Sequence, residues 1–167
     1  LVAAQQAALA GLDAALDQIV AMRNAEGAAL AAVLAARLDR VAALTQGAED
    51  CPARRPDAIR ARLEQSIAAL AGNAALDPNR LHQEALMLAS KADVREELDR
   101  LVTHVAAARD LIAKPGAVGR RLDFLAQELA REANTLCSKS NDASLTAIGM
   151  ELRVEIEQFR EQVQNIE

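Results

Sequence analysis

The sequence predicts an all-α protein whose long antiparallel helices form a helical bundle or arm. Of its 167 residues 39 are Ala and 23 are Leu, and both residue types are strong helix formers. Phe occurs twice, while Trp and Tyr do not occur, so the aromatic residues that favour strands are scarce. Gly and Pro together number 11, which leaves few positions for turns. These counts argue against all-β and doubly wound α/β folds.

The first helix is expected from about Gln5 to Leu44, either bent or divided at Gly11 and Gly27. A polar stretch with two Pro, residues 46–57, then predicts a turn. Asp57 is expected to cap a second helix over 58–71. Apolar residues fall on one face of this second helix, at Ile59, Leu63, Ile67 and Leu70.

A third helical segment is expected to begin at Asp77-Pro78 and to end at 114–116, where Lys, Pro and Gly follow one another. Its apolar phase slips near 91–93, where Asp93 and Glu96 form a possible capping box. We therefore expect a kink or a second helix start there.

A fourth helix is expected over 119–136, followed by a polar turn over 137–142. Asp142 or Ser144 then starts the last helix. The apolar residues of this last helix are spaced three or four apart, at Leu145, Ile148, Leu152, Ile156, Phe159, Val163 and Ile166. Such a narrow stripe predicts a helix that packs against partner helices.

The formal charge of −5 argues against a protein that holds nucleic acid by a bulk positive field. Local Arg clusters remain available, because 16 of the 19 basic residues are Arg. Cys51 and Cys137 are too few for a disulfide framework and are expected to be reduced thiols of a cytoplasmic protein. No apolar run approaches membrane-spanning length, so no membrane association is expected.

Acidic residues and one His give the clearest indication of a site. Asp93, Glu97 and His104 share one stripe of the third helix, and Glu128 and Glu132 share one face of the fourth. A short connection between these helices would point the two sets at each other. Carboxylates and an imidazole between helices suit Mg²⁺ or Mn²⁺. An ordinary alternative is an exposed helix surface, on which Glu128 pairs with Arg131 or Lys139.

Three segments of the sequence resemble the C-terminal domain of the YicC/YloC family of bacterial endoribonucleases. They are RLHQEALMLASKADVREELDRLVTHV (80–105), GRRLDFLAQELAREANTLCSKSND (119–142) and REQVQNIE (160–167). A weaker match, MRNAEGAALAAVLAARL (22–38), resembles the helical region that links the two family domains. The resemblance implies a linking region over 1–76, a signature domain over 77–167, and a family N-terminal domain that is absent from this chain, which begins at Leu1 rather than Met.

The resemblance further implies an endoribonuclease that depends on a divalent cation, favours Mn²⁺ and assembles as a hexamer. The expected catalytic residues are His104, Glu97, Glu128 and Glu132. The expected metal ligands are these four together with Asp93 and, from the resemblance alone, Glu84. Arg120, Arg121, Arg131 and Lys139 flank this region and are expected to hold RNA phosphates.

Either a water or the RNA 2′-hydroxyl can be the nucleophile in such a site, with His104 as base in the second route. Phe124 and Phe159 are both expected in the core, so stacking on RNA bases is not expected. The alternative hypothesis is a helical assembly module without catalysis of its own. The apolar seam of the last helix and the Ala-rich first helix would then form subunit contacts.

Overall fold

A computed structural model describes residues 2–71, 79, 82–83, 86–87, 90 and 93–166 of the chain. Its elements are α1 (Val2–Glu49), a short 3-10 helix η1 (Pro52–Arg54), α2 (Pro56–Ala71), α4 (Arg95–Ile112), α5 (Gly119–Lys139) and α6 (Ala143–Val163). No strand is present among the described residues, which confirms the predicted all-α class. The expected helix start at Asp77-Pro78 lies outside them.

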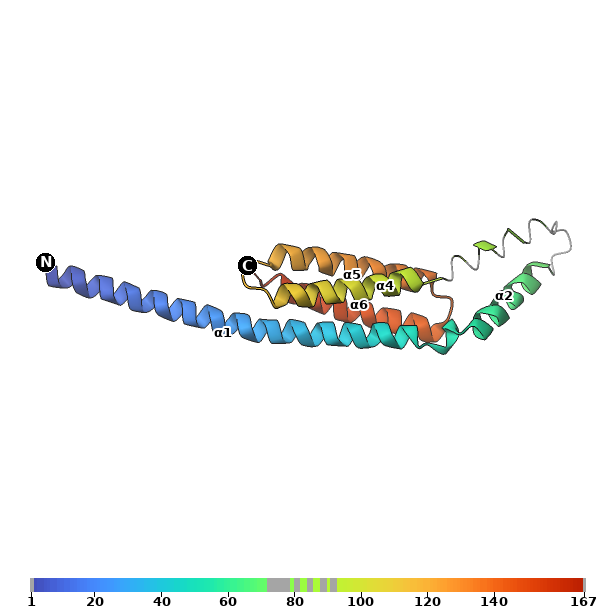
Figure 1. Ribbon diagram of the computed structural model, residues 1–167, viewed down its shortest axis with the longest axis horizontal. Helices are drawn as coiled ribbons and strands as arrows, with labels where there is room; N and C mark the ends of the chain where they lie inside the picture. The colour runs from blue at the N-terminus through green and yellow to red at the C-terminus, as the bar shows by residue number, and fades with distance from the viewer. Residues whose placement is uncertain are drawn as a thin grey trace.

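Four helices form an antiparallel bundle (Figure 1). The second half of α1 packs against α4 and α6, and α5 packs against the same two helices, so α1 and α5 lie on one diagonal and α4 and α6 on the other. Short connections join α4 to α5 and α5 to α6, as expected for neighbours that run in opposite directions. The first half of α1 extends beyond one end of the bundle, and α2 extends beyond the other.

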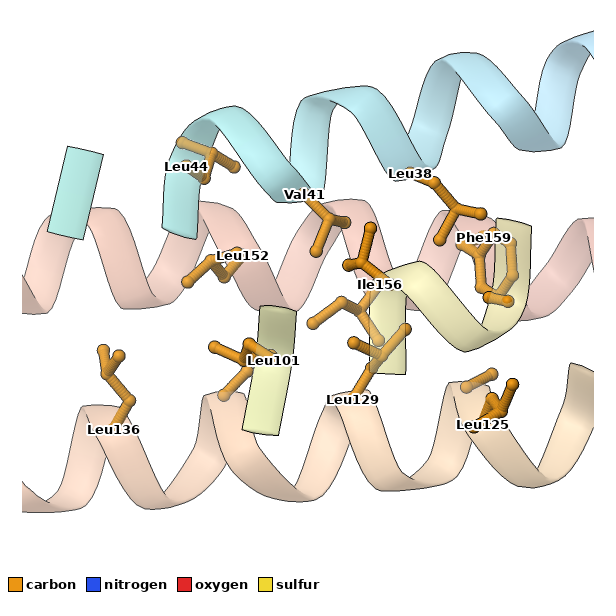
Figure 2. Packing of buried hydrophobic residues seen from close by; sticks show 14 of the residues in the cluster. Leu38, Val41, Leu44, Leu101, Leu125, Leu129, Leu136, Leu152, Ile156 and Phe159 are labelled. Atoms are coloured by element: carbon orange, nitrogen blue, oxygen red, sulfur yellow. The ribbon is translucent and has the colours of Figure 1, made fainter. Parts of the chain in front are cut away.

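The core lies along the bundle axis and is almost entirely aliphatic. Figure 2 shows side chains of α1, α4, α5 and α6 pointing into one interior, with Leu101, Leu129 and Ile156 near its centre. Phe159 on α6 is completely buried there, as predicted. The predicted α6 stripe is confirmed, because Leu145, Leu152 and Val163 are also buried.

Gly149 lets α5 and α6 approach closely. A Cβ at this position would lie 2.6 Å from Cys137 Sγ, so only glycine fits without a shift of the neighbouring side chains. Burial raises the pKa of the Cys137 thiol, as expected for a packing residue rather than a reactive nucleophile. Cys51 and Cys137 are both free cysteines.

Helix ends follow the sequence signals at some positions and depart from them at others. Asp142 caps α6, because its carboxylate accepts hydrogen bonds from Ser144 N at 2.9 Å and Leu145 N at 3.3 Å. A hydrogen bond from the Ser144 hydroxyl, followed by the bond from Leu145 N, lowers the pKa of Asp142 to about 2. Asp57, in contrast, lies inside the first turn of α2, because Pro56 already begins that helix.

The capping box predicted at Asp93 and Glu96 is wrong. The Asp93 carboxylate accepts a hydrogen bond from Arg95 N at 3.0 Å, but the N-cap residue of α4 is Val94, which makes no side-chain cap bond. The Glu96 carboxylate accepts no hydrogen bond from Asp93 N, and it binds the Arg100 side chain instead. The expected second helix start is nevertheless confirmed, since α4 begins at Arg95.

A single apolar stripe runs along α1 through both its packed and its projecting parts. Leu34, Leu38 and Val41 are buried against the bundle, while Leu12 and Leu16 on the projecting half are exposed. At 100° per residue, these five side chains fall within an arc of about 80°. The stripe therefore continues past the point where the bundle can cover it. Within the described residues, no helix is long and apolar enough to cross a membrane.

Candidate metal and RNA site

His104 on α4 and Glu128 and Glu132 on α5 converge on one face of the bundle. One possible ligand atom from each of the three lies within 4.8 Å of the other two. Glu132 is buried, and His104 and Glu128 are half-buried. The antiparallel packing of α4 on α5 produces this convergence. Because the connection between the two helices is short, the helical turn of α4 that carries His104 lies beside the helical turns of α5 that carry Glu128 and Glu132. We call these three residues the α4–α5 cluster.

Two arginines surround the cluster. Arg100, one turn before His104, donates from Nη1 to Glu132 Oε1 at 3.3 Å and also binds Glu96. The hydrogen bond to Glu132, followed by the charges of the two acids, raises the pKa of Arg100. Arg131 Nη1 lies 3.9 Å from Glu128 Oε2, so the alternative pairing of Glu128 with Arg131 is present as a loose contact. Carboxylates that bind metals usually accept a hydrogen bond from a neighbouring side chain, as Glu132 does from Arg100.

The donor set fits a divalent cation. Neighbouring ligands of an octahedral ion such as Mg²⁺ lie about 3 Å apart, and the three donor atoms lie within 4.8 Å of one another, so rotations of the three side chains would bring them to one ion. Two carboxylates suit Mg²⁺ and Mn²⁺, and an imidazole is more readily accepted by Mn²⁺ than by the harder Mg²⁺.

Glu97 is not part of this cluster, although it shares the helix stripe with His104. It lies two turns earlier on α4, where Lys139 Nζ is 2.8 Å from its Oε1. Glu97 is only 5% exposed, and its Oε2 has no hydrogen-bond partner among the described residues. Lys139 also donates to the backbone oxygen of Asp93 at 3.1 Å. Lys139 therefore joins the end of α5 to the start of α4.

The other expected site residues are distributed along the α4–α5 pair. Asp93 is exposed beside the start of α4, away from His104. Arg120 and Arg121 are exposed on the first turn of α5, at the opposite end from Lys139. Glu84 lies outside the described residues. The metal and RNA roles assigned to these residues stay predictions.

Two residues near the site, Arg100 and Phe124, were not among the expected catalytic, metal-binding or RNA-binding residues. Arg100 lies four residues after Glu96 and four before His104, and this spacing puts all three side chains on one face of the helix. The prediction that Phe124 belongs to the core is wrong, because its side chain is 59% exposed. The phase of α5 explains this, since the adjacent Leu125 faces the core and Phe124 is turned away from it by 100°.

Comparison with known proteins matches residues 48–167 to the family described as Endoribonuclease YicC-like, C-terminal. The chain is 45% identical over 168 aligned positions to a protein of Haemophilus influenzae named probable endoribonuclease YicC, covering 99% of this chain and 57% of that protein. It is 36% identical over 154 positions to a protein of Clostridioides difficile with the same name, covering 92% of this chain and 53% of that protein. This chain thus spans little more than half the length of these relatives. The chain belongs to the YicC-like endoribonuclease family, and residues 48–167 carry the family's C-terminal region.

Proposed function

We propose that this chain carries the metal-dependent catalytic site of an endoribonuclease. The observation that supports this most directly is the α4–α5 cluster, in which three side chains from two helices approach within 4.8 Å of one another. The family relationship supports RNA as the substrate, because the two relatives are named probable endoribonucleases.

His104, Glu128 and Glu132 would hold the cation. A bound divalent ion supplies positive charge to a phosphate oxygen and lowers the pKa of a water. Arg100 fixes the orientation of Glu132 through the 3.3 Å hydrogen bond and compensates part of the cluster's negative charge. Arg131, exposed beside Glu128, would contact the backbone phosphates of an approaching RNA. The nucleophile is either a water or the 2′-hydroxyl of the RNA.

The test substitutes Glu128→Gln and Glu132→Gln, separately and together, with Glu161→Gln as the control. Glu161 is an exposed acid on α6, a helix that contributes no residue to the cluster. We expect the cluster variants to lose Mn²⁺ affinity, measured by electron paramagnetic resonance, and to lower Mn²⁺-dependent RNA cleavage about 100-fold or more. Glu161→Gln should retain the parental values.

Circular dichroism checks that each variant is folded. Folded cluster variants that bind Mn²⁺ and cut RNA like the parent would contradict the proposal. The chemistry of the product ends separates the two nucleophiles, since attack by the 2′-hydroxyl leaves a 2′,3′-cyclic phosphate and attack by water does not.

A second candidate function, assembly with another copy of the chain, is favoured by the stripe on α1. The projecting half of α1 exposes Leu9, Leu12, Leu16, Ile19 and Val20. These residues continue the stripe that the bundle covers further along the same helix. Burying such a surface against an equivalent helix would remove it from water.

Analytical ultracentrifugation at several concentrations tests this assembly. We expect the parent to sediment as more than one chain, and Leu16→Glu with Ile19→Glu to shift it towards the single chain. Val154→Glu, which changes an exposed apolar residue of α6, should leave the assembly unchanged. A parent that remains a single chain at every concentration would exclude this candidate, whereas assembly that is indifferent to Mn²⁺ would not affect the catalytic proposal.

A further inference from the structure

An open hollow lies at the end of the α4–α5 pair, beside the connection between the two helices. Its volume is about 420 Å³. The side chains that carry its chemistry are Asp110, Lys114, Arg120, Arg121, Phe124 and Leu125. Ala107 and Leu111 of α4 complete its lining.

The exposed ring of Phe124 is unusual for this protein. Only two of its 167 residues are aromatic, and the other, Phe159, is completely buried. Phe124 is 59% exposed even though the core side of α5 is lined by aliphatic side chains. The π face of Phe124 is therefore accessible to a partner, whereas that of Phe159 is buried in the core.

The charges around the ring favour an anionic partner. Lys114, Arg120 and Arg121 make no ion pair or side-chain hydrogen bond within the described part of the chain. Arg100, Arg109 and Arg131, on the same two helices, are each ion-paired. Asp110 offers one negative charge against these three positive ones, so the hollow carries a net positive charge.

The hollow and the α4–α5 cluster lie on the same side of α5. Arg121, Phe124 and Glu128 occupy positions i, i+3 and i+7, which share one helix face. With a rise of 1.5 Å per residue, Phe124 precedes Glu128 by about 6 Å along the axis, and Arg120 precedes it by about 12 Å. These spans are on the order of one to two nucleotides of a single strand.

We propose that Phe124, Lys114, Arg120 and Arg121 form a subsite for one or two nucleotides of single-stranded RNA next to the α4–α5 cluster. A base stacks on the ring of Phe124, and the three cations contact the flanking phosphates. Stacking tolerates any base, because every base has a π face, so the subsite provides affinity without sequence preference. This inference rests on the proposed function, since it names the part of the RNA that is held beside the cluster.

The experiment measures binding of a fluorescein-labelled single-stranded RNA to the full chain by anisotropy, in EDTA so that no metal-dependent cleavage occurs. Phe124→Ala should weaken binding roughly 5- to 150-fold, the range expected for loss of one stacked base. Phe124→Trp should restore the affinity, whereas Phe124→Leu, which keeps an apolar side chain but no ring, should not. Val154→Ala, an exposed apolar change on α6, is the matched control.

The cations are tested by salt dependence. Arg120→Ala and Arg121→Ala should each reduce the slope of log affinity against log salt concentration by about 0.7, the value for one phosphate contact on a single strand. Arg153→Ala, an exposed Arg of α6, should leave the slope unchanged.

Three results would overturn the subsite: a parent chain that binds no RNA, parental affinity in Phe124→Ala, or equal affinity in Phe124→Leu and Phe124→Trp. A Phe124→Ala variant that changes the sedimentation coefficient but not the RNA affinity also counts against the subsite, because the ring of Phe124 would then contact another copy of the chain. The outcomes remain separate from the catalytic proposal. Binding that depends on Phe124 in a chain that never cuts RNA supports the subsite alone, and cleavage with Phe124-independent binding supports the catalytic site alone.

Discussion

Phe159→Ala is expected to destabilise the fold by about 3–5 kcal/mol, the usual cost of removing a fully buried Phe from a core. Phe159 has no exposed surface and lies among the aliphatic side chains of the four packed helices (Figure 2). Its ring is the largest fully buried side chain of the described core, so its loss leaves a cavity that its neighbours fill only in part. Urea unfolding followed by circular dichroism measures the effect.

Phe124→Ala provides the matched control for this prediction, because it makes the same chemical change at an exposed position. We expect its free energy of unfolding to stay within about 0.5 kcal/mol of the parental value. Equal losses in the two variants would mean that Phe159 does not make the dominant contact assigned to it.

Lys139→Met is expected to destabilise the fold by about 3 kcal/mol, although it changes a half-buried residue. The substitution keeps the length of the side chain but removes the ammonium 2.8 Å from Glu97 Oε1. Glu97 would then hold an unpaired charge at 5% exposure, and breaking a buried pair in this way is costly. We place the value at the lower end of the range for such pairs, because 30% of the Lys139 side chain is exposed and water screens the interaction.

The double variant Glu97→Gln/Lys139→Met separates the buried charge from other causes. An amide costs less to bury than a carboxylate, so the double variant should be more stable than Lys139→Met alone. Arg131→Met, at a more exposed ion pair, should change the free energy of unfolding by less than about 0.5 kcal/mol. A double variant that is less stable than Lys139→Met would contradict the assignment of the loss to Glu97.

Local signals in the sequence predicted much of the fold. Asp142 was identified as a possible cap because its side chain can accept from the first backbone N–H groups of α6, and the structure shows these bonds. The end of α4 was predicted from Pro115 and Gly116, and Gly116 indeed adopts a positive φ of 108°. These features depend on neighbours within a few residues, which is why the sequence alone could predict them.

The α4–α5 cluster was predicted in part, for a physical reason. Helical periodicity gives the face on which a residue lies, so His104, Glu128 and Glu132 could be placed towards one another. Periodicity does not give the axial alignment of two antiparallel helices. Glu97 shares the stripe of His104, but it lies opposite Lys139, two turns away, because packing against α5 fixes that alignment.

Phe124 shows a different difficulty. Its phase on α5 placed it outside the stripe of Leu122, Leu125 and Leu129, but its apolar character led to the opposite prediction. In α5 the helical phase of Phe124, rather than its apolar character, determines that it is exposed. In a helix whose core positions are already occupied by Leu, an additional aromatic residue is exposed however hydrophobic it is.

Because α1 is one continuous helix, the number of residues between its projecting part and its packed part fixes how the projecting apolar face is oriented relative to the bundle. Adding or deleting one residue between Val20 and Leu30 would turn the outer apolar face by about 100° and displace it by about 1.5 Å along the axis, with every core contact of the bundle retained. The number of residues between the two parts of this helix therefore determines the direction in which the outer apolar face points.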